Sequence, residues 1–512
     1  MGASAIGRDA TLRRVNLASI VDGGADDAVA LVSRGNPVTY GELRRNVECV
    51  RGGLAGLGLE PGARVAIVAA NNRWFVESYL AALGAGLVVM PLNPTSPPVE
   101  LERELAAVGA EAAVVGPMGA PAFQRVDRSK VPTLRHVVTP EGVGGGTVSF
   151  EQLCGSEPTP IVDRDPSDVA VLIFTAGTAG SPKAAMLTHG SLSANIRQVQ
   201  AMPERRLAPD DVSLGVLPMF HIFGLNVVLG VTLAAGGKVV LVERFDPATA
   251  LDTVRSHGCT IVAGAPPMWS AWASLPGAPA DAFASVRLAV SGASRLPDEV
   301  AQAMEERYGI QVLEGYGLTE ASPIVTSSTA INPERGTIGG PIPGVEIRLV
   351  DPNGEDVPLG DPGEIWVRGP NIFAGYWEDP DATARALTPD GWLRTGDVAV
   401  ADDAGRLRIV DRAKDLIIVS GFNVYPAEVE EVLLEHPNIE AAAVVGVEHP
   451  HSGEAVKAFV VPSEGRALEE DEVIDFVAAR LARYKCPTKV LFVEEIPQGM
   501  AGKVLRRELR QV

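Results

Sequence analysis

The feature that most constrains this chain is an apolar run followed at once by a loop of small residues. Val169–Ile173 predicts a buried strand, and Phe174–Lys183 adds glycines, hydroxyls and a lysine directly after it. Glycines let backbone N–H groups approach an anion, hydroxyls add donors and lysine adds charge, so the loop suits phosphates. Pro182 and Ala184 flank the lysine, which departs from the common nucleoside-triphosphate loop. Taken alone, the loop also fits a flexible turn after a buried strand.

Strand-like and helix-like segments alternate on both sides of this loop. Residues 64–69 and 86–91 predict strands, and residues 74–83 between them have helical spacing. This β–α–β alternation predicts mostly parallel sheets covered by helices. Further strands end in small or polar residues, at the sheet edge where ligands bind. They are residues 237–242, 260–265 and 286–291.

Length and charge limit the classes of function. A chain of 512 residues is too long for one core, so two or three domains are expected. The net charge of −20 argues against general nucleic-acid binding, which needs a basic field. No apolar core of a signal peptide is visible near residue 1, and the apolar stretch 79–92 is too short to span a membrane. We expect a cytoplasmic protein that binds small molecules and has no membrane span, although peripheral membrane contact and a homodimer stay open.

Two further segments suit a nucleotide. In Glu314–Glu320, glycines flank Tyr316, whose ring can stack on a base, while Thr319 can lie near a phosphate and Glu320 can reach Mg²⁺. A turn with a capping Thr and a surface Glu is the alternative for this segment. Further along, Asp397 follows a glycine and can accept both ribose hydroxyls, or it is simply an aspartate in a turn.

In their order, these segments resemble the adenylate-forming enzymes, a superfamily of AMP-dependent acyl-CoA synthetases and fatty acid–CoA ligases. The resemblance covers essentially the whole chain. It implies α/β architecture: a large N-terminal domain of stacked mixed sheets (1–411, with an antiparallel β-subdomain at about 345–410), a hinge (412–415) and a small mobile α+β domain (416–512). Such enzymes join a carboxylate to Mg·ATP, giving an acyl-adenylate and pyrophosphate. A thiol, usually that of coenzyme A (CoA), then takes the acyl group and releases AMP.

The resemblance also assigns residues. Lys503 matches the lysine that bridges the reacting carboxylate and the α-phosphate, and Lys414 falls at the usual hinge position. A positioned ammonium and Mg²⁺ offset the charge that grows on the phosphoryl oxygens. Thr319 and Glu320 complete the catalytic group, with Glu320 as the metal contact. The expected ATP- and AMP-binding residues are Thr175, Ala176, Gly177, Thr178, Gly180, Ser181, Lys183, Gly292, Ala293, Glu314, Gly315, Tyr316, Gly317, Asp397 and Arg412.

The phosphate loop departs from the family pattern. Ala176, Ala179 and Ala184 stand where Ser, Thr or Ser, and Gly are usual, so the loop has fewer side-chain donors. A catalytically weak homologue that binds nucleotide or acyl ligand as a regulator is therefore an alternative. The intact Lys503 and Glu320 count against it.

The segment Met219–Asn226 resembles the wall of the acyl pocket. Amino-acid-activating relatives carry an Asp there, whereas this chain has Phe220 and His221, so a buried substrate amine would lack its partner. His221 positions the carboxylate, gates the pocket or is a satisfied core histidine. The expected pocket residues, mostly small or apolar, are Phe220, His221, Phe223, Asn226, Ala265, Met268 and Ser291.

For the acceptor, Ser420–Pro426 resembles the segment that delivers the thiol in CoA ligases. The expected CoA path comprises Gly421, Phe422, Tyr484 and Lys485, with a solvated basic face as the alternative for the last two. The resemblance implies an ATP-dependent carboxylic acid–CoA ligase that acts on medium- to long-chain fatty acids. A fatty acyl-AMP ligase and an aryl-CoA ligase are the alternatives within the family.

Overall fold

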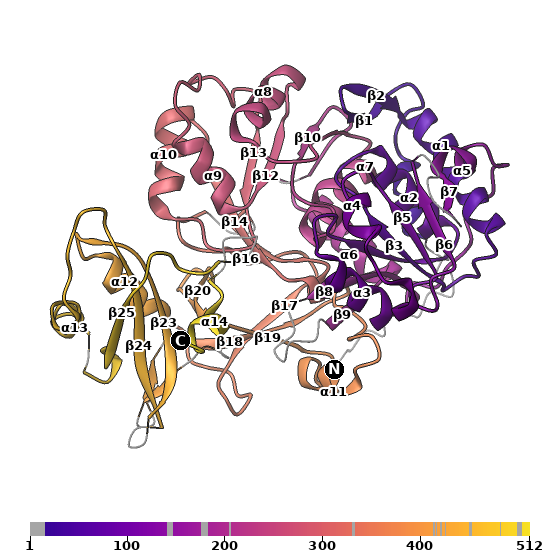
Figure 1. Cartoon of the computed structure of the whole chain (residues 1–512). Helices are drawn as coiled ribbons and strands as arrows, with labels where there is room; N and C mark the ends of the chain where they lie inside the picture. Colours follow the sequence, from indigo (N-terminus) through magenta and orange to yellow (C-terminus); the bar gives the residue numbers. More distant parts are fainter. Residues whose placement is uncertain are drawn as a thin grey trace, which may run out of the picture.

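The structure is a computed structural model, and its described residues are 16–140, 147–175, 183–203, 206–329, 333–412, 415, 417–419, 422–424, 426–449, 453–481, 483–498 and 504–512. Their strands form four sheets (Figure 1). Two large sheets hold the first two thirds of the chain, and two smaller sheets hold the rest. None of the helices in these ranges is long and apolar enough to cross a bilayer.

The first large sheet has seven strands in the order β7-β6-β5-β3-β4-β8-β9, and every neighbouring pair is parallel except β8 and β9. Its central strands are short Val-, Ile- and Ala-rich runs that are buried on both faces, as expected for a covered parallel sheet. The strands are β3 (Arg64–Val68), β4 (Val88–Leu92), β5 (Ala112–Val115), β6 (His136–Thr139), β7 (Thr147–Ser149), β8 (Val169–Thr175) and β9 (Lys183–Thr188).

The second large sheet has nine strands in the order β16-β15-β14-β13-β12-β10-β11-β1-β2. Its middle is parallel from β14 to β1, whereas β2, β15 and β16 join antiparallel at the two edges. The strands are β1 (Val29–Ser33), β2 (Asn36–Thr39), β10 (Val212–Gly215), β11 (Lys238–Leu241), β12 (Ile261–Gly264), β13 (Leu288–Ser291), β14 (Val312–Gly317), β15 (Ile324–Ser327) and β16 (Gly340–Pro341).

The helices begin and end at local signals. Helix α1 starts with a capping box between Thr39 and Glu42, and α8 starts at Asp246 and ends at Gly258, which is left-handed. The helices of this region are η1 (Leu17–Val21), α1 (Tyr40–Gly56), α2 (Arg73–Gly84), α3 (Pro98–Ala107), α4 (Ala120–Phe123), η2 (Arg128–Lys130), α5 (Phe150–Cys154), α6 (His189–Gln200), the π-helix η3 (Phe223–Gly230), α7 (Val231–Ala234), α8 (Pro247–His257), α9 (Pro266–Ala273), α10 (Asp298–Tyr308) and η4 (Thr319–Ala321).

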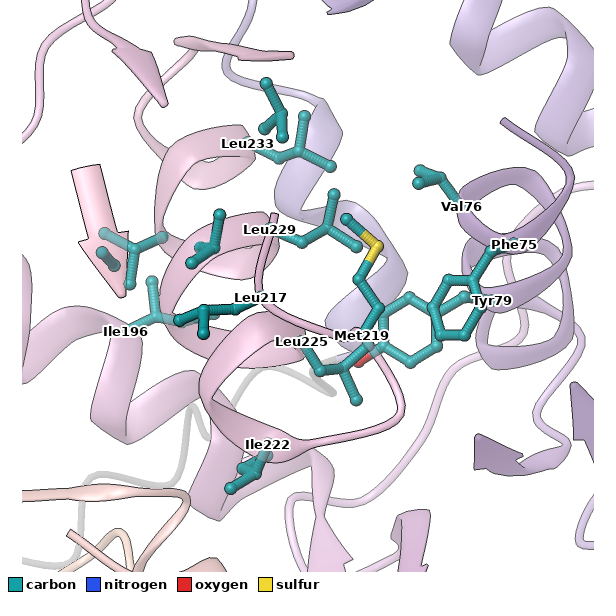
Figure 2. Packing of buried hydrophobic residues seen from close by; sticks show 14 of the residues in the cluster. Phe75, Val76, Tyr79, Ile196, Leu217, Met219, Ile222, Leu225, Leu229 and Leu233 are labelled. Carbon is teal, nitrogen blue, oxygen red and sulfur yellow. The ribbon is translucent and has the colours of Figure 1, made fainter. Parts of the chain in front are cut away.

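Helices between the two large sheets share one core. Figure 2 shows Phe75 and Tyr79 of α2 facing Met219 and Leu225, and all four side chains are buried. Residues four apart share a face of a helix, so Phe75 and Tyr79 form one apolar stripe. The stripe belongs to the largest core cluster, which also contains residues of both sheets. This packing holds the start of η3 against the seven-stranded sheet.

Two smaller sheets complete the molecule (Figure 1). One holds β17 (Glu346–Val350), β18 (Gly363–Arg368), β19 (Leu393–Ala401) and β20 (Leu407–Arg412), all antiparallel, with α11 (Pro380–Ala386) in a connection. The other, at the lower left in Figure 1, holds β21 (Ile417–Val419), β22 (Phe422–Val424), β23 (Ile439–His449), β24 (Gly453–Pro462) and β25 (Lys489–Phe492), with α12 (Pro426–Leu434), α13 (Glu470–Ala478), η6 (Arg483–Lys485) and α14 (Arg506–Leu509). The expected fold class, stacked α/β sheets with a β-subdomain and a small α+β unit, is confirmed.

Two of the three glutamates of helix α3, Glu102 and Glu104, make opposite contributions to stability. Burial, with a smaller effect of Glu100, raises the pKa of Glu104 to about 7, and its Oε2 has no hydrogen-bond partner among the described residues. Glu102 instead accepts bonds from Lys130 Nζ at 2.6 Å and Asp127 N at 2.8 Å, and these lower its pKa. A carboxyl whose folded pKa is raised stabilises the fold below its unfolded pKa of 4.5 and loses that contribution as the pH rises through about 7.

We therefore expect Glu104→Gln to stabilise the protein at pH 8, by up to about 3 kcal/mol, and to have a much smaller effect near pH 4.5. Glu102→Gln, the matched control on the same helix, is expected to destabilise at pH 8. Urea unfolding at both pH values measures these changes. A Glu104→Gln effect that is the same at both pH values would contradict the account.

Candidate active site

A cavity of about 930 Å³ lies against one face of the nine-stranded sheet. Ile261 and Ala263 of β12 and Leu288 and Val290 of β13 line it at a spacing of two residues, and Ser291 joins them at the end of β13. This spacing follows from the alternation of side chains along a strand. Facing the sheet are side chains from η3 and α6. They are Phe223, Val227, Val228 and Val199. Each described residue of the lining lies between positions 70 and 326.

The structure brings many of the sequence-predicted residues to this cavity. Six of the seven expected pocket residues line it: Phe220, His221, Phe223, Ala265, Met268 and Ser291. Six of the expected nucleotide-binding or catalytic residues also line it: Gly292, Ala293, Gly315, Tyr316, Gly317 and Thr319. The two groups meet at the carboxyl ends of β12, β13 and β14, where ligands of parallel sheets bind.

Residues after β13 approach the cavity closely. A Cβ added at Gly292 would lie 3.0 Å from the Phe223 ring, so this position has little room for a side chain. The next residue, Ala293, has a φ of +75°, in the left-handed region that non-glycine residues seldom adopt. Such strain costs of the order of 1 kcal/mol and gathers at ligand sites. The local backbone is thus shaped for a ligand rather than for stability.

Strand β14 continues through the candidate nucleotide segment. Gly315, Tyr316 and Gly317 pair with β15 in antiparallel register, so they are strand residues and do not form the turn that was the alternative for this segment. The glycines are needed for close packing, because a Cβ at Gly317 would lie 2.3 Å from the carbonyl oxygen of Pro323. The strand points the Tyr316 side chain at the cavity and at Asp397.

Asp397 is held by a bulge in β19. Gly396, with a φ of +72°, lies where the register of β18 and β19 shifts, and its N–H donates to Glu364 Oε1 at 3.0 Å. The Thr395 hydroxyl accepts a bond from Asp397 N at 3.1 Å. In this position Asp397 Oδ2 accepts a bond of 2.7 Å from the Tyr316 hydroxyl. Tyr316 is the candidate for base stacking and Asp397 is the candidate for ribose binding. They are 81 residues apart in sequence but lie side by side in the structure.

Tyr376, which was not among the residues predicted from the sequence, contacts two residues that were. Its hydroxyl donates to Glu320 Oε1 at 2.7 Å, and its ring lies 5.3 Å from Lys183 Nζ. Residues 374–377 run along the outer edge of β9, where Met186 N donates to Gly375 O at 2.9 Å and Trp377 N donates to Ala184 O at 2.8 Å. Burial and the neighbouring Glu320 raise the pKa of Tyr376, which therefore stays a hydrogen-bond donor throughout the neutral range.

Glu320 has the chemistry of a magnesium contact. One carboxylate oxygen is oriented by Tyr376, and Mg²⁺ sites at nucleotides commonly use one or two carboxylates together with phosphates and water. Among the residues that the structure describes, no cluster of three or more His, Cys, Asp or Glu side chains forms a metal cage. The residues present thus fit an ion that is shared with a bound nucleotide.

We expect Tyr376→Phe to lower kcat/KM for Mg·ATP by roughly tenfold, since a hydrogen bond to a charged group contributes about 1.5–3 kcal/mol. The Mg²⁺ concentration for half-maximal rate should also rise. Tyr308→Phe is the matched control, because its hydroxyl donates to Trp272 O at 2.8 Å in the core and not at the site. Initial rates over a grid of ATP and Mg²⁺ concentrations measure both effects. Equal effects of the two variants would exclude an orienting role for Tyr376.

His221 faces the cavity as an exposed side chain, and its ring lies 4.8 Å from that of Phe220. Desolvation by the neighbouring protein lowers the pKa of the imidazole below its ordinary value. Asn226 does not line the cavity, in contrast to the expectation. Its amide donates to Leu192 O at 3.2 Å and to Ser322 O at 2.7 Å, so it fastens η3 to its neighbours. The reason is the winding of η3, which turns Asn226 away from the face that carries Phe223.

Glu314 also lies away from the cavity. Its Oε2 accepts a bond of 3.0 Å from the N–H of Leu296, and burial raises the pKa of the carboxyl. It thereby orients the segment that follows β13 instead of reaching a ligand. Asn71, which carried no sequence signal, has a related role. Its amide donates to Gly215 O at 2.9 Å and to Leu217 O at 2.8 Å, and so holds the cavity wall to the seven-stranded sheet.

Several expected residues lie outside the described part of the chain. They are Ala176, Gly177, Thr178, Gly180, Ser181, Lys414, Gly421 and Lys503. Thr175 and Lys183, at the ends of the phosphate loop, are described and oppose each other across β8 and β9. The backbone of Arg412 pairs with Asp397, and Phe422 and Tyr484 lie in β22 and η6, but their side chains are not among those described.

Two basic residues of the C-terminal unit, Lys485 and Arg506, are held in ion pairs. Lys485 Nζ contacts both carboxylate oxygens of Glu428, at 2.5 and 2.7 Å. Arg506 Nη2 contacts both oxygens of Glu430 at 2.7 Å, and its Nη1 lies 3.7 Å from Asp415 Oδ2. The Arg506 contacts join α14 to α12 and to Asp415, the last residue of the expected hinge. Helix α12 also reaches the large unit through an ion pair between Glu431 and Arg295.

Comparisons with known proteins agree with this geometry. The family model of the AMP-binding enzyme matches residues 21–377, and that of the AMP-binding enzyme C-terminal domain matches residues 428–503. A feruloyl-CoA synthase from Amycolatopsis is 38% identical over 94% of this chain and 96% of its own. A long-chain-fatty-acid–CoA ligase from Yersinia pestis is 36% identical over 94% and 91%. ATP-bound MatB from Rhodopseudomonas palustris is structurally similar, with a TM-score of 0.88, 33% identity and coverage of 97% and 98%.

Proposed function

The chain belongs to the AMP-binding enzyme family, and we propose that its acid substrate is a medium- to long-chain fatty acid. It is an ATP-dependent acid–thiol ligase of the adenylate-forming type that uses ATP and CoA. The relatives act on both aromatic and aliphatic acids by name, so identity alone does not select the substrate. The chemistry of the cavity wall is the observation that carries the proposal.

The cavity extends well below the nucleotide residues. Both Leu288 and Ser291, the first and last residues of β13, line it, which corresponds to a depth of about 10 Å along the strand. An extended chain of roughly eight carbons has this length. The wall of this deep part is aliphatic: Val199, Leu207, Leu214, Val228, Val231 and Ile261.

The deep part offers little to a polar substrate. Its Ser213 hydroxyl is already bonded to the Thr232 hydroxyl at 2.7 Å. A 4-hydroxyl of an aromatic acid would be buried there at a cost of about 1–3 kcal/mol unless it found a partner. Each methylene of a fatty acid instead gains about 0.8 kcal/mol on burial. The wall therefore favours an aliphatic chain.

An aryl-CoA ligase is the second candidate, favoured by the upper part of the cavity. Phe220, Phe223 and Tyr316 line it near the carboxyl ends of the strands, where an aromatic ring next to the carboxylate would lie. Offset or edge contacts between rings contribute about 0.5–1.5 kcal/mol beyond burial. This free energy is comparable with that gained by burying one or two methylene groups. An aromatic acid would therefore bind better than a fatty acid only if its ring contacts contributed more than the burial of the aliphatic chain.

We assign the catalytic roles as proposals on the same basis. Lys503 offsets charge between the carboxylate and the α-phosphate, and Asp397 and Tyr316 bind ribose and base. Glu320 holds Mg²⁺, which supplies charge stabilisation at the phosphates when bound. We further propose domains of 1–411 and 416–512, with the hinge at 412–415.

The test is a series of kcat/KM values for saturated acids from C4 to C16, beside ferulate and 4-coumarate, with CoA present. We expect a rise of roughly fourfold for each methylene up to about C10, from the burial of each added group. We expect ferulate to fall below the best fatty acid by at least about tenfold. A higher kcat/KM for ferulate than for every fatty acid would replace the proposal with the aryl-CoA ligase.

A further inference from the structure

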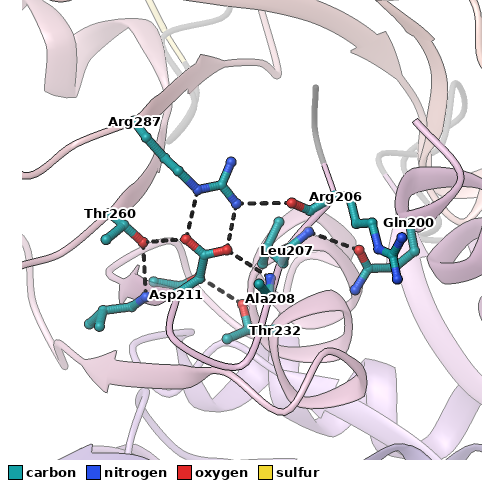
Figure 3. Close-up of polar contacts among 10 residues, drawn as sticks. Gln200, Arg206, Leu207, Ala208, Asp211, Thr232, Thr260 and Arg287 are labelled. Carbon is teal, nitrogen blue, oxygen red and sulfur yellow. Dashed lines mark hydrogen bonds and ion pairs between the residues drawn. The ribbon is translucent and has the colours of Figure 1, made fainter. Parts of the chain in front are cut away.

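A polar network lies at the amino-terminal ends of β10, β12 and β13, below the aliphatic part of the cavity. Figure 3 shows Asp211 at its centre. Arg287 binds both oxygens of this carboxylate, with Nε at 2.7 Å from Oδ1 and Nη2 at 2.5 Å from Oδ2. The Thr260 hydroxyl donates to Oδ1 at 2.7 Å and accepts from Val212 N at 2.9 Å. The Asp211 side chain is buried, at 5% exposure, whereas the Arg287 side chain reaches it from the surface and is 40% exposed.

The same network fixes three consecutive backbone positions. Arg287 Nη2 donates to the carbonyl oxygen of Arg206 at 2.9 Å, and Asp211 Oδ2 accepts from Ala208 N at 2.8 Å. Between them, the N–H of Leu207 donates to Gln200 Oε1 at 2.9 Å (Figure 3). Three side chains from different elements thus hold a segment that has no regular secondary structure of its own.

Leu207 is the cavity-lining residue at the centre of this segment. Its side chain is 7% exposed and lines the cavity, as do Ile261 and Leu288, which directly follow Thr260 and Arg287. Since Ile261 and Leu288 begin their strands, they mark the end of the cavity farthest from the nucleotide residues. Leu207 therefore lies across the end of the cavity rather than along its side.

We propose that Leu207 is the floor of the acyl cavity and sets the longest acid accepted, and that Arg287 is a positioning residue that fixes this floor. The inference rests on the proposed acyl function of the cavity. It adds a length limit and the residues that set it. Removing the leucine side chain opens space for two or three further carbons. Weakening the pair between Arg287 and Asp211 allows the segment that carries Leu207 to shift when a longer acyl chain is bound.

The test measures kcat/KM for saturated acids from C4 to C18 in the wild-type protein and four variants. Leu207→Ala is expected to move the optimum two to three carbons longer, and Leu207→Phe to move it at least two carbons shorter. Leu217→Ala is the matched control, because Leu217 lines the cavity above the floor, and its profile should keep the wild-type optimum. Arg287→Lys loses the bidentate contact with Asp211. We expect its kcat/KM profile to broaden toward longer acids, with KM for ATP unchanged.

Each outcome decides the inference. Opposite shifts for the two Leu207 variants, with none for Leu217→Ala, support the floor. Leu207 variants that keep the wild-type chain-length optimum overturn the proposal. An Arg287→Lys variant whose kcat/KM falls by the same factor at every chain length overturns the positioning role of Arg287. If the wild-type enzyme activates aromatic acids and no fatty acid, the proposed substrate fails, and the same variants are assayed with 4-alkoxybenzoates of increasing length. An unchanged longest alkoxy group in Leu207→Ala then overturns the floor as well.

Discussion

Replacing Lys503 with Ala is expected to slow acyl-adenylate formation by about a thousandfold while leaving thioester formation from supplied acyl-adenylate within about twofold of wild type. The first step brings a carboxylate against a phosphoryl group, and negative charge grows between them. A positioned ammonium offsets that charge, and once the adenylate has formed it has no further charge to offset. The loss should therefore be confined to one half-reaction.

The described residues on both sides of position 503 are attached to each other and to the C-terminal domain. Gln498 and Val504 form an antiparallel bridge on either side of the lysine's position, and Leu505 N donates to Pro497 O at 2.8 Å. Arg506 is then anchored on Glu430, as described above. We propose that this segment and the C-terminal domain move as one body between the two steps.

Pyrophosphate release reports the first step, and acyl-CoA formation from synthetic acyl-AMP reports the second. Lys489→Ala is the control, since this lysine is exposed on β25 of the same domain and should leave both rates unchanged. Equal losses in the two half-reactions of Lys503→Ala would show that the lysine acts on the fold or on both steps, and would remove its assigned role.

Replacing Glu320 with Gln is expected to lower kcat for adenylation by about a hundredfold or more, because a metal contact loses its charge. Gln keeps the shape of the side chain and still accepts a bond from Tyr376, so the local fold should persist. The requirement for Mg²⁺ should rise with the loss of rate.

Titration of ATP binding with and without Mg²⁺ separates this role from a structural one. The variant is expected to keep the affinity for metal-free ATP and to lose most of the gain that Mg²⁺ provides. Glu299→Gln on the exposed face of α10 is the matched control and should behave as wild type. A Glu320→Gln variant with normal rates and normal Mg²⁺ dependence would place the metal elsewhere.

The sheets and much of the site were predictable because their signals are local. The runs at residues 64–69 and 286–291 are short, apolar and bounded by small residues, and both are strands in the structure. Predictions were less accurate where a glycine has two possible uses. A turn was the alternative interpretation for the segments of Gly317 and Gly396, but both residues lie in strands, one for close packing and one in a bulge.

Contacts between distant segments could not be predicted. Tyr376 lies 56 residues from Glu320 in sequence and contacts it because residues 374–377 run along β9. No local sequence pattern predicts this pairing of the segment with β9. The Asp211–Arg287 pair likewise depends on the neighbouring positions of β10, β12 and β13 in the sheet. Asn226 was expected to face the pocket because of its place in a motif, but the direction of a side chain depends on the winding of its helix.

The most direct test of the central claim is a competition between decanoate and ferulate at equal concentration, with Mg·ATP and CoA, read by mass spectrometry of the products. An aliphatic cavity behind an adenylation site predicts decanoyl-CoA as the main product, with no accumulation of decanoyl-AMP. Feruloyl-CoA as the main product would contradict the assignment of the cavity to fatty acids. Acyl-AMP that accumulates in the presence of CoA would contradict CoA as the acceptor.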